Sequence, residues 1–251
     1  MGNRDYRKFE DLTFDDFRKH AMDESLDCYE KIGFPEEYRK GYERYIFADI
    51  KGKLEGLRTK RKTVLDLGCG CSDLAEMVIE NCRKNGSRLL LVDSREMLSR
   101  LPDDEFIEKF ACRFPECQRL FDRYRGKVDA IIVYSVIQHV FLEANIFNFL
   151  DKACELLSDG GEVLIGDIPN ISKRKRFFAS KAGVEYHKAF TGKDEPPGIN
   201  IFDLDSKKLD DGVVTGILLR YRNAGLDTYL LPQGKRLPMS NRREDILLRK
   251  P

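Results

Sequence analysis

The residues with the clearest chemical potential lie in the segment Val-Leu-Asp-Leu-Gly-Cys-Gly-Cys-Ser-Asp at positions 64–73. An apolar run ends there in two glycines one residue apart, Gly68 and Gly70, so the backbone can approach a bound ligand closely. The pattern predicts a buried strand, a glycine turn and then a helix, whose first N–H groups can bind a negative group. This arrangement is typical of a nucleotide-type pocket.

The position of a third glycine separates two kinds of nucleotide site. A dinucleotide site would have glycine at position 73, where this chain has Asp73, so NAD and FAD are disfavoured. A dinucleotide oxidoreductase stays open as an alternative. Residues 63–82 contain no Lys or Arg, although the whole chain has 44 among 251 residues. This window suits a cationic ligand such as a sulfonium, unless a buried strand and an amphipathic helix lack basic residues by chance.

A second acidic residue follows a second apolar run, Arg-Leu-Leu-Leu-Val-Asp at 88–93. It stands about twenty residues beyond the glycine turn, a spacing at which a carboxylate can accept hydrogen bonds from ribose hydroxyls. Asp93 is therefore the candidate ribose ligand. The alternative is that Asp93 or Ser94 caps a helix.

Further strands alternate with helices along the chain. Apolar residues at helical spacing predict a helix over residues 145–157, which the Asp-Gly-Gly at 159–161 is expected to end. The further strands are expected within residues 105–110, 127–135 and 162–167. Such alternation predicts a parallel sheet that binds ligands at the carboxyl ends of its strands. The residues expected to face one crevice there are Gly68, Asp93, Ser135 and Asp167.

The glycine turn, with Asp66 two residues before it, resembles motif I of the class I S-adenosylmethionine-dependent methyltransferases. Residues 128–140 are similar to the fourth-strand motif of small-molecule methyltransferases, and residues 157–161 to the turn before their fifth strand. The resemblance extends over roughly residues 61–170. It implies an α/β, Rossmann-like sheet of seven strands with the last strand antiparallel, closed by a hairpin of residues 228–232 and 245–249.

The resemblance also implies S-adenosylmethionine as cofactor and S-adenosylhomocysteine as product. It places residues 111–113 near the adenine, and Ser94 and Met97 beside the adenosine. The residues that we assign to the cofactor are Asp66, Gly68, Cys69, Gly70, Asp73, Asp93, Ser94, Met97, Ala111, Cys112, Tyr134 and Ser135.

Methyl transfer from a sulfonium is an in-line displacement, so positioning supplies most of the help, about 7–11 kcal/mol in good geometry. A general base adds about 10²–10⁴-fold. His139 is the leading candidate base because it follows the end of the fourth strand and its ordinary pKa suits proton removal near neutrality. His187 is the second candidate, and His20 is incidental. The alternative is that both candidates are structural histidines.

Two flanking regions are expected to hold the acceptor. Residues 1–60 read as a helical lid, with Thr13 and Asp16 forming an N-cap pair and with apolar and aromatic residues at helical spacing from Tyr38 up to Arg58, which predict a helix there. Residues 61–251 read as the methyltransferase domain. Residues 170–212 form an insertion after strand five that begins with a basic run, 173–176, which either clamps an anionic acceptor or is a solvated face. The candidate acceptor contacts are Tyr29, Tyr38, Arg39, Tyr42, Gln138, Asp167, Asn170, Lys173, Arg174 and Arg176.

Residues 29–39 and 167–174 are similar to methyltransferases of bacterial capsule and O-antigen gene clusters. That resemblance implies a small polar acceptor, a sugar, nucleotide-sugar or phosphorylated precursor, methylated on oxygen in preference to nitrogen. Formation of methyl phosphoramidate capsule groups is one such chemistry. An RNA methyltransferase and a non-catalytic subunit that binds the donor are the alternatives.

Composition limits the partners and the location. The net charge of +1 argues against general nucleic-acid binding, so a small-molecule acceptor is expected. Seven cysteines without paired C-x-x-C spacing predict free thiols in a reducing compartment, with no disulfide and no metal. No signal peptide, myristoylation site or membrane-spanning run is recognised, so a cytoplasmic protein with no membrane partner is expected.

Overall fold

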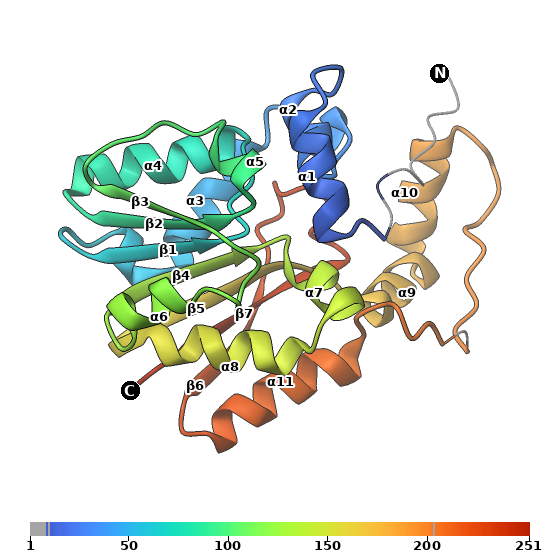
Figure 1. Ribbon diagram of the computed structural model, residues 1–251. Coiled ribbons are helices and arrows are strands. Elements are labelled where there is room, and N and C mark those ends of the chain that lie inside the picture. The colour runs from blue at the N-terminus through green and yellow to red at the C-terminus, as the bar shows by residue number, and fades with distance from the viewer. Residues whose placement is uncertain (1–8, 10, 203) are drawn as a thin grey trace.

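A seven-stranded sheet forms the centre of the molecule, for which we describe residues 9, 11–202 and 204–251 of a computed structural model (Figure 1). The strands are β1 (Thr63–Leu67), β2 (Arg88–Asp93), β3 (Ile107–Ala111), β4 (Val128–Tyr134), β5 (Leu157–Pro169), β6 (Asp227–Pro232) and β7 (Arg243–Arg249). They are ordered β3-β2-β1-β4-β5-β7-β6. β1 to β5 pair in parallel, whereas β7 is antiparallel to both β5 and β6. The predicted Rossmann-like fold and its closing hairpin are confirmed.

Helices cover both faces of the sheet because successive side chains of each strand point to opposite faces. Val64 packs into the core on one side, and Leu65 into the core on the other. The first core is covered by α3 (Glu43–Lys53), α4 (Asp73–Asn85) and α5 (Arg95–Leu98), and the second by α6 (Gln118–Tyr124), α8 (Ile146–Leu156) and α11 (Asp211–Asn223). The sheet is therefore buried on both faces, as parallel sheets generally are.

The remaining helices gather at the carboxyl ends of the parallel strands (Figure 1). They are α1 (Phe14–Met22), α2 (Cys28–Lys31), α7 (Ile137–Glu143), α9 (Ile171–Ala179) and α10 (Lys181–Thr191), with the 3-10 turn η2 (Glu36–Tyr38). A second 3-10 turn, η3 (Glu55–Leu57), lies near the start of β4 instead, where Gly56 packs against Ala130. A capping box of Thr13 and Asp16 starts α1, as the sequence predicts. The domain division at residue 60 stays a prediction.

Two local expectations are wrong. The helix predicted over 145–157 ends at Leu156, and the chain passes directly into β5, so the Asp-Gly-Gly lies inside the strand's first residues instead of ending the helix. The expected single helix up to Arg58 is broken into η2, α3 and η3, because Gly41 adopts a left-handed conformation and Leu54 an extended one.

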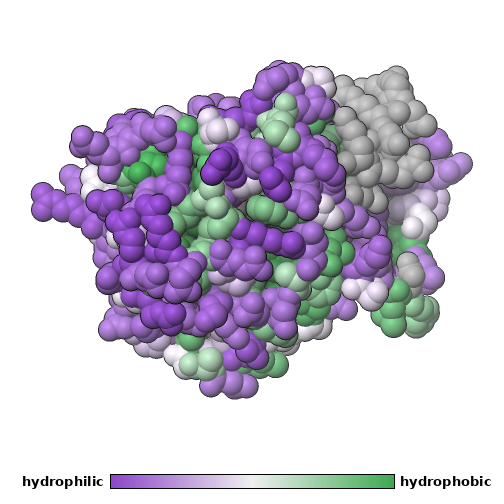
Figure 2. Space-filling view, viewed as in Figure 1, coloured by the Kyte–Doolittle hydropathy of each residue, from purple (hydrophilic) through white to green (hydrophobic). Residues whose placement is uncertain are grey.

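Hydrophilic residues cover most of the face shown in Figure 2, and hydrophobic residues appear on it in smaller areas. Within the described ranges, no helix combines the length and the apolar character that a membrane span requires. The cytoplasmic location stays a prediction.

Candidate active site

The glycine turn after β1 is held between two other segments. Gly68 and Gly70 both have positive φ, of 75° and 60°, which favours glycine. A Cβ atom on Gly68 would lie 2.6 Å from Val136 Cγ2, and one on Gly70 would lie 2.7 Å from Ile32 Cγ2. Both glycines are therefore required, by backbone conformation and by close packing against α2 and the residues after β4.

Asp93 at the end of β2 fixes this turn. Its Oδ2 accepts a hydrogen bond from the Gly70 N–H over 2.9 Å, and its Oδ1 accepts one from the Ser94 N–H over 2.7 Å. Burial raises the pKa of Asp93 to about 6, although both hydrogen bonds favour the carboxylate. Burial and the neighbouring Asp93 raise the pKa of Asp66, on β1, to about 7. The turn is thus next to two buried acidic groups.

A cavity of about 1080 Å³, which includes some open solvent, lies in front of the turn. Its lining combines backbone of the glycine turn with aromatic rings from the N-terminal helix, from residues 114 and 149 and from the end of β4. Ten predicted site residues line it: Arg39, Gly68, Cys69, Gly70, Asp93, Met97, Cys112, Tyr134, Ser135 and His139. Most of the sequence-based donor site is therefore brought together.

Four residues assigned to the cofactor lie outside this lining and have other contacts. Asp66 lies buried within β1, and Ala111 is exposed at the end of β3. Asp73 accepts a hydrogen bond from the hydroxyl of Tyr29 over 3.2 Å. Ser94 is the N-cap of α5, since its hydroxyl accepts from the Met97 N–H over 3.2 Å. The alternative of a helix cap at Ser94 is thus what the structure shows, while Asp93 faces the cavity.

Helix α1 roofs the cavity, and its two phenylalanines were missed by the sequence analysis. Phe14 and Phe17 both line the cavity. The Phe14 N–H donates to Oε2 of Glu143 in α7 over 2.8 Å, and Arg18 pairs with Glu96 of α5 at 2.9 Å. The helix therefore spans the crevice from the β4 side to the β2 side. The cap at Thr13 predicted the helix, but no sequence signal indicated which face would meet the donor.

His139 lies on α7 and faces the cavity, as expected. Its Nδ1 lies 3.0 Å from the carbonyl oxygen of Leu12, which can only accept, so Nδ1 carries the proton in the neutral ring. The ring packs edge-on against Phe17 with centroids 4.8 Å apart. Burial lowers the pKa of His139 from 6.5 to about 4. The expectation of a pKa near neutrality is therefore wrong, because the ring is desolvated beneath the N-terminal segment.

Arg39 is the charged residue that enters the cavity from the N-terminal region. Its side chain is 4% exposed, and its guanidinium lies 3.8 Å from the centroid of the Phe34 ring. Its Nη2 donates to Ser135 Oγ over 2.7 Å and to Asp167 Oδ2 over 3.4 Å. Its Nε is buried and has no hydrogen-bond partner among the described residues. One hydrogen-bond donor of Arg39 is thus left unsatisfied by the described residues.

Glu43, one helical turn further on, was also missed by the sequence analysis. It is 3% exposed, and neither carboxylate oxygen has a hydrogen-bond partner in the described part of the chain. Burial raises its pKa to about 7, and the positive charge of Arg39 opposes this shift. A buried glutamate is rare, and nothing in its local sequence indicates that it is enclosed.

Asp167 is anchored behind Arg39 by several groups. The Arg243 guanidinium donates to its carbonyl oxygen over 3.0 Å, and Gln233 Nε2 donates to its Oδ1 over 3.4 Å. Its own N–H donates to Asp245 Oδ1 over 2.8 Å, and Asp245 in turn pairs with Lys53 at 2.6 Å. Asp167 therefore supports Arg39 and Ser135 from a fixed position, although it does not line the cavity.

The other acceptor candidates are mostly engaged within the protein. Gln138 Nε2 donates to the carbonyl of Ser135 over 2.7 Å, and Asn170 caps α9. Lys173 donates to the carbonyl of Arg243 over 2.8 Å, and Arg176 pairs with Asp211. Tyr38 is half-buried, Tyr42 is exposed, and Arg174 and His187 line a second pocket. Among the acceptor candidates, Arg39 lines the main cavity.

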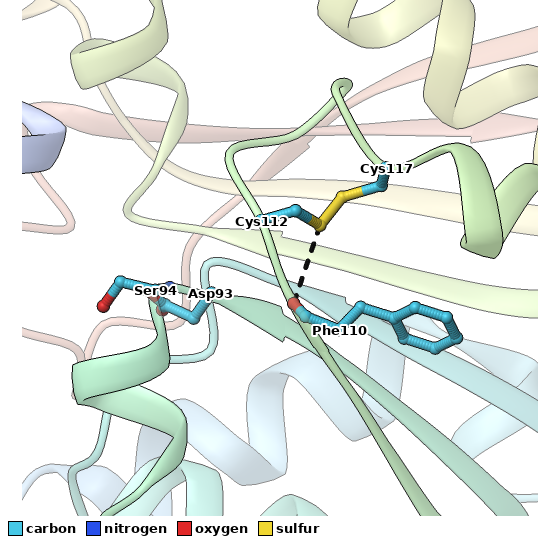
Figure 3. Close-up of a disulfide and its surroundings, with 5 residues drawn as sticks. All are labelled: Asp93, Ser94, Phe110, Cys112 and Cys117. Atoms are coloured by element: carbon cyan, nitrogen blue, oxygen red, sulfur yellow. Dashed lines mark hydrogen bonds between the residues drawn. A yellow bond between two sulfur atoms is a disulfide. The ribbon is translucent and has the colours of Figure 1, made fainter.

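The cysteine prediction is wrong for one pair. Cys112 and Cys117 form a disulfide, with their Cα atoms 5.8 Å apart (Figure 3). The loop between β3 and α6 folds back on itself, so two cysteines five positions apart meet without C-x-x-C spacing. Cys112 also lines the cavity beside Asp93, whose carbonyl accepts from its N–H over 3.1 Å. The inference of a reducing compartment therefore loses part of its basis.

The residues present fit S-adenosylmethionine. The cavity offers aromatic and aliphatic walls, which suit a ring system, and a buried acid at the end of β2, which suits a ribose. Within the ranges described, no group of three or more His, Cys, Asp or Glu side chains could hold a metal ion. The absence of a metal stays a prediction.

Comparisons with known proteins agree with this geometry. Residues 65–163 match the family model described as a methyltransferase domain. No curated protein matches the sequence. A chain in the complex between the Haloferax volcanii Trm112 methyltransferase activator and a methyltransferase has a similar structure, with TM-score 0.56 and 14% identity over 94% of this chain and 97% of that one.

Two other solved structures are similar over most of their length. The plantazolicin methyltransferase BpumL, in complex with a monoazolic desmethylPZN analog and S-adenosylhomocysteine, has TM-score 0.56 and 14% identity over 95% of this chain and 98% of that one. The N-methyltransferase NodS of Bradyrhizobium japonicum, in complex with S-adenosylhomocysteine, has TM-score 0.54 and 12% identity over 95% and 98%. Residues 65–163 thus carry a methyltransferase domain within a methyltransferase fold, and the predicted methyltransferase activity and S-adenosylmethionine cofactor are confirmed.

Proposed function

We propose that the enzyme methylates an oxygen, in preference to a nitrogen, of a small polar acceptor that carries a negative charge. The observation that supports this most is Arg39, which lines the donor cavity and whose buried Nε has no hydrogen-bond partner among the described residues. A buried unsatisfied donor costs about 1–3 kcal/mol, so such a group indicates a ligand that satisfies it. An acceptor phosphate or carboxylate would do so through the planar guanidinium.

The low pKa of His139 narrows the kind of oxygen that can react. When bound, S-adenosylmethionine supplies an electrophilic methyl group on a sulfonium. His139 Nε2 is the ring atom left to accept a proton, since Nδ1 is protonated and bonded to Leu12. A base with a pKa of about 4 removes a proton from an alcohol poorly. An oxygen that is already ionised needs no base, and this favours phosphate-type and carboxylate-type acceptors over sugar hydroxyls.

The protein's own contribution to catalysis is then largely positional. Phe14 and Phe17 of α1 line the roof of the cavity with apolar rings. Ser135 and Asp167 hold Arg39 in place, and Arg39 orients the acceptor. Positioning of this kind is the main source of acceleration available to an in-line transfer. His139 would act as a hydrogen-bonding partner of the acceptor, and His187, in the second pocket, would contact a distal part of it.

Within this class, a phosphorylated or sugar-linked precursor of a surface polysaccharide fits the charge requirement. A phosphoramidate is one such acceptor, because its oxygens are ionised at neutral pH. Two observations support this role: the sequence resemblance to capsule and O-antigen methyltransferases, and the positive charge of Arg39 in the cavity.

The experiment is a transfer assay with methyl-labelled donor and paired acceptors. Sugar phosphates, amino-acid phosphates, nucleotide-sugars and phosphoramidate are each compared with the uncharged analogue of the same molecule. We expect label in at least one charged acceptor and none in its uncharged analogue. Transfer to uncharged acceptors at equal rates would contradict the role of Arg39, and transfer to RNA alone would contradict a small-molecule acceptor.

A further inference from the structure

A second pocket lies between α10, the adjoining α9 and the segment that leads into β7. Its lining includes Arg174, Phe178, Tyr186, Phe190 and Arg242. It is distinct from the donor cavity, because none of the residues that the structure describes lines both. The combination of two guanidiniums with three aromatic rings is therefore a separate chemical environment.

The two arginines in this pocket have no carboxylate partner in the described part of the chain. By contrast, two basic neighbours of Arg174 on α9 are neutralised, Arg176 by Asp211 and Lys173 by Glu244 at 3.7 Å. Burial and the positive charge of Arg242 both lower the pKa of Arg174, so the two guanidiniums are close enough to repel each other. Two like charges held together with no carboxylate of the described residues beside them indicate a site for an anion.

Aromatic rings position these guanidiniums. The Cζ atoms of Arg174 and Arg242 lie 5.2 Å and 5.6 Å from the centroid of Phe178. Next to them, Tyr186 and Phe190 stack with an interplanar angle of 6° and centroids 6.1 Å apart, and both are exposed, at 39% and 58%. Exposed parallel rings beside a positive pair offer a stacking surface for a planar ligand.

Two pairs of consecutive residues connect this pocket with the donor cavity. Arg242 lines the pocket, while Arg243 donates to the carbonyl of Asp167 behind Arg39. Tyr38 lies close to both Arg242 and Tyr186, whose charges influence its pKa, and the next residue, Arg39, lines the donor cavity. The two sites are therefore adjacent, and one extended molecule could contact both.

We propose that this pocket binds the phosphate of a ligand that also carries a planar ring, a molecule of the nucleoside-phosphate class. Arg174 and Arg242 bind the phosphate, and the stacked rings of Tyr186 and Phe190 bind the planar group. The inference that this ligand is the distal part of the methyl acceptor rests on the proposed function. The inference that the pocket binds such a ligand does not depend on the proposed function.

The test uses uridine monophosphate as the probe and the full-length protein saturated with S-adenosylhomocysteine, so that the donor cavity is filled. Calorimetry measures the Kd of uridine monophosphate, uridine and inorganic phosphate. We expect the nucleotide to bind at least tenfold more tightly than either fragment, and Arg174→Gln and Arg242→Gln each to weaken it at least tenfold. Arg176→Gln, on the same helix, is the matched control and should leave the Kd unchanged. Tyr186→Leu should weaken the nucleotide but not phosphate.

Several results would overturn the proposal. The pocket would not be a nucleotide site if uridine monophosphate did not bind at millimolar concentration. The same would follow if the Arg174→Gln and Arg242→Gln proteins bound it as tightly as the parent protein. Equal affinities for phosphate and nucleotide would show that the rings of Tyr186 and Phe190 do not contribute to binding. Thermal unfolding of each variant checks folding, and Arg242→Lys, which keeps the charge, should retain part of the affinity. Failure of S-adenosylhomocysteine to bind would instead count against the donor site, so the two failures are distinguishable.

Discussion

The Ser135 hydroxyl donates to Asp167 Oδ2 over 2.6 Å, and both residues have positive φ, of 60° and 58°. Ser135 directly follows β4, and Asp167 lies where the pairing of β5 with β7 changes register. Non-glycine residues in this conformation each cost about 1–3 kcal/mol and are held by their surroundings. Here Ser135 and Asp167 are bonded to each other and to Arg39. The backbone strain is therefore concentrated at the proposed acceptor end of the cavity.

Two substitutions of Asp167 can separate the effect of its backbone strain from the effect of its charge. Asp167→Asn should unfold within a few degrees of the parent, because asparagine tolerates positive φ, but it should raise the acceptor KM about tenfold because Arg39 loses its ionic partner. Asp167→Val should lower the unfolding temperature clearly, since a β-branched residue is poorly accommodated there. Thermal unfolding and steady-state kinetics measure the two effects. Equal unfolding temperatures for both variants would contradict the strain.

Arg39 should contribute to acceptor binding more than to donor binding. Arg39→Lys keeps the charge but loses the planar fork, so we expect the acceptor KM to rise at least tenfold, given about 1.5–3 kcal/mol for a hydrogen bond to a charged group. The Kd for S-adenosylhomocysteine should change less than threefold. Arg44→Lys, an exposed position on the adjoining α3, is the control. A larger loss of donor affinity than of acceptor affinity would assign Arg39 to the donor instead.

The sheet could be predicted because its strands carry strong local signals. Continuous apolar runs at β1, β2, β4 and β5 are long enough to identify buried strands, and their alternation with helices permits few topologies. The boundaries were harder to predict. β5 begins at Leu157, five residues before the apolar run that marked it, because its first residues already pair with the β4 side of the sheet. Pairing of this kind depends on the neighbouring strand and leaves no local pattern.

The donor half of the site could be predicted for the same reason, whereas the acceptor half could not. Gly68, Gly70 and Asp93 follow strand ends, which topology brings to one edge. Phe14 and Phe17 reach the site from a helix whose docking is set by long-range contacts such as Arg18 with Glu96. The basic run at 173–176 was a local signal, but Lys173 and Arg176 are neutralised by partners about 35 to 70 residues away in the chain.

The Cys112–Cys117 disulfide makes a countable prediction. Of the seven cysteines, five are free thiols in the structure. Thiol titration of the unreduced, denatured protein should therefore give five, and seven after reduction. Cys117→Ser should weaken S-adenosylhomocysteine binding severalfold, because Cys112 lines the cavity and the loop beside it would be released. Cys154→Ser, away from the cavity, is the control. Seven thiols without reduction would show that the disulfide does not form.

Asp66 should make the protein less stable as the pH rises. Its pKa is about 7 when folded and about 3.8 when unfolded, so between these values the folded chain binds the proton more tightly. Stability from this group is therefore lost as the pH rises from 4 to 7, at about 1.4 kcal/mol per pKa unit. Asp66→Asn should raise the free energy of unfolding at pH 8 more than at pH 5, by denaturant titration. Asp227→Asn, an exposed control, should show no such dependence. A larger increase in the free energy of unfolding at pH 5 than at pH 8 would contradict the raised pKa of Asp66.

His139 should have the opposite effect, since its pKa is lowered from 6.5 to about 4. The unfolded chain binds the proton more tightly in this range, so the stability from this group increases as the pH rises from 4 to 6.5. The chain has three histidines, so NMR titration can follow each ring, and the signal lost in His139→Gln identifies this one. We expect a neutral ring protonated at Nδ1 down to about pH 5, and a transfer rate without a step near pH 6.5 from this residue. A midpoint near 6.5 would mean that the ring is solvated, and would restore His139 as an effective base for alcohols.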